Sequence, residues 1–563
     1  MRSFKPKFLH KQNNNQLLKL IPLGGMGDVT KNMYVYEYGN DIIVVDCGIG
    51  FPDESMPGVD FVIPDTSYLN DKKDRIRGFI ITHGHEDHLG GLPYIWPKFQ
   101  APIYTQRLTA GFIRNKFAEF DLPKNAVHEL KIHDKLNLGA FQISFYQVSH
   151  SVPDSTGIVI KTPVGTIVHQ ADFKIDWTPP SKQVTDVETA AQVGAAGVKL
   201  LLIDCLRIEK SGFNKSESLV EESFERVALE AKGKILITMT SSNVSRMQQA
   251  VNVASKLGKK LAVVGRSFES NFQIARDLGY LTVPPNLVIT SDAISSFGAN
   301  KVMILIAGAF GQIGSSLSRA ANGEHKQVKL LAGDSVVFSA DPIPSTEMAY
   351  NALIDNLINI GVNVYYSAIS PNLHISGHAA ADELKLMVNL IKPEFMIPIG
   401  GEFRQMKHFS NTFQKMGYKP DQILELKNGQ IAQVSDNVKV SGAIEIQNIF
   451  VDGLGVGDVG HVVLRDRQVM SEEGIVIVVI PFDRREGKLA GDPDIISRGF
   501  VFEDIAQDLL DDAKKIVKAS LDKHDKRVSD WRFIRHSIEE ELEKYLYHIT
   551  ERRPLILPLI VEV

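Results

Sequence analysis

Apolar runs of strand length dominate the first part of the chain. Runs at residues 20–23, 42–45, 79–81, 141–148, 157–161 and 166–169 are separated by turn residues, and this pattern predicts strands with few long helices. From about residue 198 to 370, strand-like runs alternate with longer stretches of helical periodicity. Repeated strand–helix–strand units predict a parallel sheet with helices on both faces, so the expected fold class is α/β.

The later regions can be assigned in more detail. Strands are predicted at 199–203, 235–239, 261–264, 302–306, 336–338 and 395–398, and helices at 217–232, 245–257, 267–279 and 379–390. A third unit begins near residue 440. It contains an amphipathic helix at 503–524 and a strand-like tail at 555–563. The apolar stripe of that helix fits either a dimer contact or an ordinary core.

The composition is that of a soluble globular protein, with 44% apolar and 23% charged residues. At 563 residues the chain is too long for a single core, and about three domains are expected. The formal net charge is only −5, so a nucleic-acid partner would require basic residues gathered locally. Cys47 and Cys205 are the two cysteines and form no C-x-x-C motif, which indicates a reducing, cytoplasmic setting without a disulfide scaffold.

The N-terminal segment is basic, with Arg2, Lys5, Lys7 and Lys11, but it has no apolar core of signal-peptide length. We expect residues 1–15 to be a flexible tail, and an arm that touches RNA is the alternative. The longest apolar stretches, such as 474–482, are far shorter than a membrane span, so no membrane association is expected.

A dense group of metal-ligand side chains follows the predicted strand at 79–81. His83, His85, Asp87 and His88 fall within six residues. Alternation at a strand end points the first two in a common direction, and the turn that follows brings the other two to the same place. Imidazole nitrogen and carboxylate oxygen are ligands that zinc takes, so a zinc site is predicted here rather than a polar surface loop.

Two further residues extend this prediction. His150 follows one predicted strand and Asp172 follows another. A single histidine after a strand is more often an ordinary surface or core residue. Strand ends on one edge of a sheet converge, however, so both side chains are expected to join the loop that already carries three histidines and an aspartate.

Together these segments resemble the metallo-β-lactamase superfamily, more narrowly the β-CASP ribonucleases and most closely the bacterial ribonuclease J family. The resemblance extends in order over nearly the whole chain. It is also carried by the segments at 24–27, 45–48, 242–243, 264–267, 333–335, 374–378, 401–402, 452–453, 497–500 and 552–554.

The resemblance implies a metallo-β-lactamase αββα sandwich, an inserted β-CASP domain with a parallel sheet, and a small α+β C-terminal domain. The expected boundaries are 16–210 and 371–440 for the two parts of the sandwich and 211–370 for the β-CASP domain. Residues 441–460 would form a linker, and 461–563 the C-terminal domain. The inserted domain would cover the site and leave a channel for single-stranded RNA.

The resemblance also implies roles for individual residues. One zinc would be bound by His83, His85 and His150, and a second by Asp87 and His88, with Asp172 bridging the two. Asp87, His378 and Asp204 are the catalytic candidates, and a buried capping role is the alternative for Asp204. The residues expected to bind the RNA substrate are His374, Ser376, Gly377, His378, Ser242 and Asn243.

A structural calcium site is a further implication of the resemblance. Its oxygen ligands would come from Gly58, Asp60 and Asp452. The alternative is that the first two form a plain turn and that Asp452 opens a loop.

The chain departs from the family at one metal ligand. Where the family has Pro-Ile-His-Gly-Glu, this chain has Gly400 in place of the histidine. The second zinc would keep Asp87, His88 and Asp172 but would be bound more weakly. Glu402 could swing toward the metal, although nothing in the sequence requires it. Loops of the β-CASP region also differ, at 205–207, 245 and 307–312, which is typical of a divergent second paralogue.

Three functions are compatible with these features. The first is a zinc ribonuclease that acts as a 5′→3′ exonuclease and endonuclease in rRNA maturation and mRNA decay. The second is a catalytically weak or inactive subunit that binds RNA and an active ribonuclease J. The third, hydrolysis of a small lactam or thioester, does not explain the inserted domain. The resemblance implies either a homodimer or a hetero-oligomer with a second ribonuclease J.

Overall fold

The computed structural model describes residues 17–343, 346–453, 455–483, 488–501, 507–523 and 531–563. These residues form two compact units. The larger runs to Phe51 and from Val62 to Ile449, and the smaller contains Pro52–Phe61 and Phe450–Val563. The predicted basic tail at 1–15 and both ends of the predicted helix at 503–524 lie outside the described residues.

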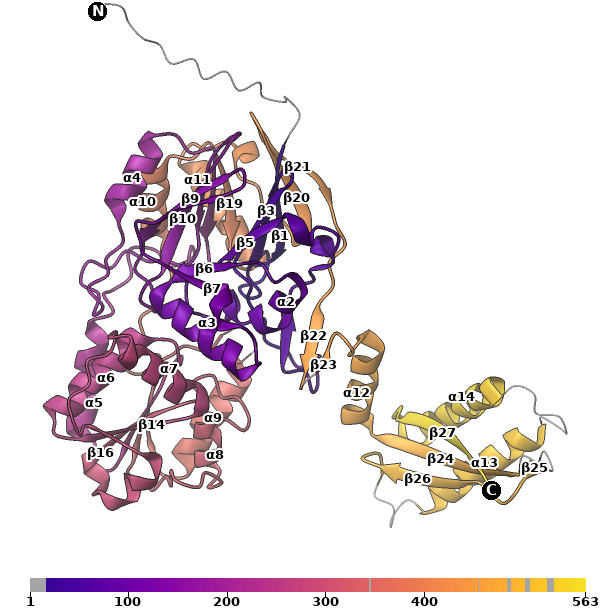
Figure 1. Cartoon of the computed structure of the whole chain (residues 1–563). Helices are drawn as coiled ribbons and strands as arrows, with labels where there is room; N and C mark the ends of the chain where they lie inside the picture. Colours follow the sequence, from indigo (N-terminus) through magenta and orange to yellow (C-terminus); the bar gives the residue numbers. More distant parts are fainter. Residues whose placement is uncertain (1–16, 344–345, 454, 484–487, 502–506, 524–530) are drawn as a thin grey trace, which may run out of the picture. The chain divides into compact units, whose positions relative to one another are not determined.

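Two sheets pack face to face in the larger unit (Figure 1). In spatial order, the first contains β21 (Val438–Ala443), β20 (Gln430–Val434), β1 (Leu18–Gly24), β2 (Met33–Tyr38), β3 (Asp41–Val45), β5 (Ile76–Ile80), β6 (Ile103–Gln106) and β7 (Val127–Leu130). The second contains β19 (Phe395–Ile399), β12 (Leu200–Asp204), β11 (Gly165–Gln170), β10 (Thr156–Thr162), β9 (Phe141–Gln147) and β8 (Lys135–Leu138). Apolar side chains such as Tyr36, Ile43 and Ile160 fill the space between the sheets.

Helices cover the outer faces of this sandwich (Figure 1). Leu384 and Phe409 are among the helix residues that join the buried core. The helices are α1 (Glu86–Leu89), α2 (Leu92–Phe99), α3 (Arg107–Glu119), α4 (Val187–Ala195), α10 (Ala381–Ile391) and α11 (Phe403–Lys415). The αββα arrangement predicted from the sequence is thereby confirmed.

The segment of the chain between β12 and β19 forms a third sheet. In the sandwich itself, β12 and β19 are parallel neighbours. All pairings in this third sheet are parallel. Its order is β15 (Val288–Ile289), β14 (Lys260–Val264), β16 (Val302–Ile306), β13 (Ile235–Thr238), β17 (Ser335–Phe338) and β18 (Asn363–Tyr365). The helices around it are α5 (Leu219–Glu230), α6 (Val244–Lys256), α7 (Arg266–Asp277), α8 (Ser316–Ala321) and α9 (Glu347–Asn359). This is the predicted inserted parallel-sheet domain.

The smaller unit contains a sheet with helices against one face. Its elements are β22 (Ile449–Asp452), β23 (Gly455–Val456), α12 (His461–Glu473), β24 (Ile475–Asp483), β25 (Lys488–Leu489), β26 (Asp494–Arg498), α13 (Gln507–Lys523), α14 (Trp531–Thr550) and β27 (Leu555–Glu562). Strand β24 pairs with β25, β26 and β27. The buried residues of β24, α13 and α14 form the core. Among the described helices of the chain, none has the length and apolar character that a membrane span requires.

Candidate metal centre

A buried strand and a tight loop place the first ligands. Strand β5 ends at Ile80, and the backbone N–H of Thr82 donates to Asp46 Oδ1 over 2.8 Å. The Thr82 hydroxyl donates to the same carboxylate. This anchor turns the chain after the strand, so that His83 and His85 leave the sheet edge just before α1 begins.

Three imidazole nitrogens meet at one point. His85 Nδ1 lies 3.1 Å from His83 Nε2 and 3.1 Å from His150 Nε2. Two ligands of one tetrahedral zinc, each about 2.0–2.1 Å from the ion, lie about 3.3 Å apart. The predicted residues therefore have the chemistry and the spacing for one zinc, with Asp172 as a fourth donor in the same group.

A second group of donors shares the carboxylate of Asp172. His88 Nε2 lies 3.4 Å from Asp87 Oδ2 and 3.4 Å from Asp172 Oδ2. Asp172 Oδ2 is also 3.6 Å from His83 Nε2 and 3.7 Å from His150 Nε2. One oxygen thus faces both groups, as a bridging ligand must.

The ligand imidazoles are held by partners of their own. His88 Nδ1 is 2.7 Å from Asp46 Oδ2, and His150 Nδ1 is 2.8 Å from the carbonyl of Gly377. Such contacts fix the ring and leave Nε2 free for a metal. The role of Asp46 was not predicted, although it follows a buried strand inside one of the recognised motifs. Its complete burial is visible only in the fold.

Burial and nearby charge act differently on these histidines. Burial lowers the pKa of His83, His85 and His150, in the case of His85 to about 4. Burial also opposes protonation of His88, but three carboxylates, foremost that of Asp172, outweigh it and raise the pKa. The first group therefore presents neutral imidazoles, the form that binds metal.

His378 and Asp204 lie beside the shared carboxylate. His378 Nδ1 is 2.9 Å from Asp204 Oδ2, and His378 Nε2 is 3.8 Å from Asp172 Oδ2. Despite burial, the two carboxylates raise the pKa of His378 to about 9. The other oxygen of Asp204 accepts the backbone N–H of Leu206 over 2.8 Å. Asp204 therefore contacts both a histidine and the backbone of the following turn, and its catalytic role stays a prediction.

Gly400 lies close to Asp204. It follows β19 with a φ of 64°, and its N–H donates to the carbonyl of Gly25 in the glycine loop at 24–27 over 3.0 Å. A Cβ at position 400 would meet only Asp204 Oδ1, at 3.8 Å. Glu402 is engaged elsewhere, because it caps α11 and pairs with Arg404 at 2.8 Å.

The predicted substrate-binding residues differ in the hydrogen bonds that they already make. Ser376 and His374 lie on the same loop as His378, and the Ser376 hydroxyl accepts the His378 N–H over 3.2 Å. Asn243 is the N-cap of α6, so its side-chain oxygen already accepts a backbone N–H. Ser242 precedes it and is nearly buried.

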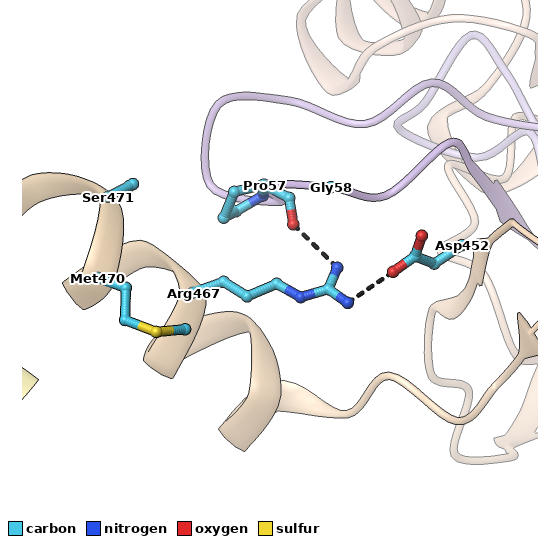
Figure 2. Close-up of a pocket in the computed structure, with 6 residues that line it drawn as sticks. All are labelled: Pro57, Gly58, Asp452, Arg467, Met470 and Ser471. Atoms are coloured by element: carbon cyan, nitrogen blue, oxygen red, sulfur yellow. Dashed lines mark hydrogen bonds and ion pairs between the residues drawn. The ribbon is translucent and has the colours of Figure 1, made fainter. Parts of the chain in front are cut away.

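The predicted calcium ligands lie close together in the smaller unit, but an arginine lies among them (Figure 2). Arg467 Nη2 is 2.6 Å from Asp452 Oδ2, and Nη1 donates to the carbonyl of Pro57 over 3.2 Å. Asp60 instead accepts the N–H of Gly453 over 2.8 Å. A guanidinium therefore supplies the positive charge beside Asp452, and this geometry does not fit calcium unless the arginine moves. Calcium binding stays a prediction.

Family models match successive parts of the chain. Residues 26–186 match the metallo-beta-lactamase superfamily, and residues 232–357 match the ribonuclease J beta-CASP domain. Residues 361–421 match a Zn-dependent metallo-hydrolase RNA specificity domain, and residues 462–563 match the ribonuclease J C-terminal domain.

Curated relatives match over nearly their full lengths. Ribonuclease J2 of Bacillus subtilis is 36% identical, with 98% of this chain and 100% of the relative covered. Ribonuclease J 1 of Streptococcus pyogenes is 37% identical over 96% of each chain. Ribonuclease J 2 of Staphylococcus aureus is 33% identical over 98% of this chain and 99% of the relative.

A solved structure supports the fold alone. The crystal structure of a protein of unknown function from Enterococcus faecalis V583 superposes with a TM-score of 0.51 at 16% sequence identity. It covers 74% of this chain and 100% of its own.

Proposed function

The chain belongs to the ribonuclease J family, and from this premise we propose that it is a zinc-dependent ribonuclease that hydrolyses phosphodiester bonds of single-stranded RNA. The proposed mode is 5′→3′ exonuclease with some endonuclease activity, in rRNA maturation and mRNA decay in the cytoplasm. The observation that carries the proposal is the convergence of His83, His85, His150, Asp87, His88 and Asp172 into two donor groups with one shared oxygen.

Zinc suits these donor groups better than calcium or magnesium, because four of the six donors are imidazoles. When bound, the metal pair would lower the pKa of water and stabilise negative charge on the phosphate. His83, His85 and His150 would hold one ion, and Asp87 and His88 the other. Asp46 and the Gly377 carbonyl would keep the imidazoles oriented.

We assign the proton-handling role to His378. Its Nδ1 is tied to Asp204, so its Nε2 is the atom directed at the bridging carboxylate and at anything bound beside it. There it can donate to a phosphate oxygen or to the leaving oxygen. Asp204 would act by fixing the ring and its tautomer, as a carboxylate next to a catalytic histidine does.

Position 400 limits the second metal. Gly400 contributes no side chain, so Asp87, His88 and Asp172 are the protein donors that remain for this ion. We therefore propose that the second zinc binds more weakly than the first, and that turnover depends on zinc concentration. The alternative hypothesis is that the chain is a catalytically weak paralogue that binds an active ribonuclease J. It also draws on Gly400.

An apolar sheet surface supports the proposed association with a second ribonuclease J chain, either identical or homologous. On β27, Leu557, Leu559 and Val561 point to one side and are 41%, 39% and 43% exposed. Ile496 on β26 shares that face, because it and Leu557 both pair with Ile477 of β24. Helices α13 and α14 pack on the opposite face. Exposed apolar surface of this kind is typical of a protein contact.

The direct test is cleavage of a 5′-monophosphorylated, single-stranded oligoribonucleotide by the purified protein with added zinc. We expect hydrolysis that is lost when Asp87 and His88 are both changed to Ala. A Glu119→Ala variant, altered on the exposed end of α3, is the control and should cleave normally. Equal cleavage by the wild type and the double variant would refute the proposal.

A further inference from the structure

A buried arginine joins the inserted domain to the loop that carries His374. Arg246 lies in the first turn of α6 and is only 2% exposed. Its Nε and Nη2 donate to Glu217 Oε1 over 2.7 and 2.6 Å. Nη2 also donates to the carbonyl of Ile375 over 3.1 Å, and Nη1 donates to the carbonyl of Ser339.

The remaining contact of this guanidinium is with a histidine. Arg246 Nη1 lies 3.0 Å from His374 Nδ1. A guanidinium has five N–H groups, and these contacts use all five. Arg246 therefore has no donor left for RNA, and any influence that it has on the substrate must pass through its neighbours.

The contact fixes which nitrogen of His374 carries the proton. A guanidinium can only donate, so His374 Nδ1 must be the acceptor and be unprotonated. In a neutral imidazole the proton is then on Nε2. Burial, then Arg246 and Arg207, lowers the pKa of His374 to about 3, against the opposing effects of Asp341 and of a backbone contact with Ser339, so the ring is neutral near pH 7.

The His374 side chain keeps part of its surface exposed. The side chain is 21% exposed, and the nearest acidic oxygen, Asp341 Oδ2, lies 3.8 Å from Nε2, beyond hydrogen-bond length. The same loop continues to Gly377, whose carbonyl holds the metal-site residue His150. A phosphate that reached the exposed part of this ring would meet a neutral N–H donor.

We propose that Arg246 is a positioning residue that holds His374 in its Nε2–H tautomer, so that this histidine donates a hydrogen bond to an RNA phosphate. This rests on the proposed ribonuclease function. The other tautomer would direct a lone pair at the phosphate oxygen and repel it. Glu217 supports this arrangement, because its carboxylate neutralises the buried guanidinium and fixes the orientation of the Arg246 side chain.

Neutron diffraction from crystals of the zinc-loaded wild-type protein tests the tautomer directly. Deuterium on His374 Nε2 and none on Nδ1 is the expected result. Deuterium on Nδ1, alone or together with Nε2, would overturn the proposal. Because this measurement requires neither RNA nor turnover, it stands even if the proposed activity fails.

A double-variant cycle tests the consequence for RNA. Arg246→Lys keeps a positive charge opposite Glu217 but lacks the planar guanidinium that binds Glu217 and His374 together. His374→Gln places an amide donor near the Nε2 position. The quantity measured is the Kd of a 3′-labelled phosphorothioate oligoribonucleotide. We expect Arg246→Lys to weaken binding roughly ten-fold in the wild type, the effect of a lost hydrogen bond to a charged group. In the His374→Gln background the effect should nearly vanish.

The same loss in both backgrounds would show that Arg246 is merely structural and would refute the tautomer role. The matched control is Arg276→Lys on the neighbouring helix α7, where the arginine is exposed and pairs with Gln273. It should leave Kd unchanged. Zinc content and Tm, measured for every variant, identify any that has lost its fold, and the neutron result does not depend on them.

Discussion

At the scale of single residues, the centre depends on side chains that bind no ligand themselves. A histidine that binds a metal uses one ring nitrogen as the ligand, and the other nitrogen makes a hydrogen bond that orients the ring. The fold supplies that hydrogen bond. Asp46 does this for His88, and a backbone carbonyl does it for His150. Residue types and spacing could predict which side chains come together, because a strand end followed by His-x-His-x-Asp-His is informative by itself. These supporting contacts join segments far apart in the chain, so spacing could not predict them.

Changing Asp46 to Asn should weaken metal binding while leaving all six predicted ligands in place. The amide cannot match the carboxylate's hold on His88, and the loss of such a partner typically costs about 10–100-fold in metal affinity. Competition with a zinc chelator measures this affinity. Asp41→Asn, at the other end of the same strand, is the control and should bind zinc normally. An unchanged affinity in the Asp46 variant would show that the contact is dispensable.

His374 should make folding sensitive to acid. Its folded pKa of about 3 lies below the value of about 6.5 in an unfolded chain, so the unfolded state binds more protons between these values. The contribution of His374 to the free energy of unfolding is therefore fully present above pH 6.5 and is lost as pH falls toward 3. Burial, Arg246 and Arg207 disfavour the proton, and Asp341 and the backbone of Ser339 favour it. Between pH 6.5 and 4.5 the His374→Gln variant should lose about 2 kcal/mol less unfolding free energy than the wild type, as measured by urea titration. Parallel losses would contradict this.

At the scale of elements, the apolar pattern predicted the helices α5, α6, α7 and α10 to within about two residues and five of the six strands in the second sheet of the sandwich. It predicted only β1, β3 and β5 among the eight strands of the first sheet. It did not predict α3, because the first region was interpreted as strands and turns with few long helices. The structure gives α3 thirteen residues, and the pattern of its buried side chains becomes clear only against β6 and β7. The left-handed backbone at Gly400 was equally invisible, since a glycine in sequence does not reveal its φ.

Position 400 allows a gain-of-function test. Gly400→His would add an imidazole where a Cβ has room, with Asp204 Oδ1 as its nearest neighbour. The positive φ costs a non-glycine residue roughly 1–2 kcal/mol, so some loss of stability is expected. We expect tighter binding of the second zinc and faster RNA cleavage at limiting zinc. Gly400→Ala, which carries the same backbone cost without a ligand, is the matched control and should show neither gain. Equal behaviour of the two variants would show that position 400 is not at the metal.

At the scale of the whole molecule, the sandwich holds the candidate metal ligands, the inserted domain contributes Arg246 through α6, and the smaller unit carries an exposed apolar sheet face. Leu559→Asp on β27 would place a charge in that face. If the face joins two chains, the variant should sediment as a smaller species than the wild type, with its zinc content unchanged. A Lys544→Asp change on the exposed surface of α14 is the control. Identical sedimentation of all three proteins would exclude this face as the contact.

We propose that one edge of the sandwich holds two zinc ions that the chain uses to cleave RNA. The most direct test is to titrate zinc into metal-free protein while measuring bound zinc per chain and the rate of RNA cleavage in the same samples. We predict that a first zinc binds tightly without activity and that cleavage rises only as a second, weaker zinc binds. Full cleavage with one zinc per chain, or two bound zincs without cleavage, would contradict the account.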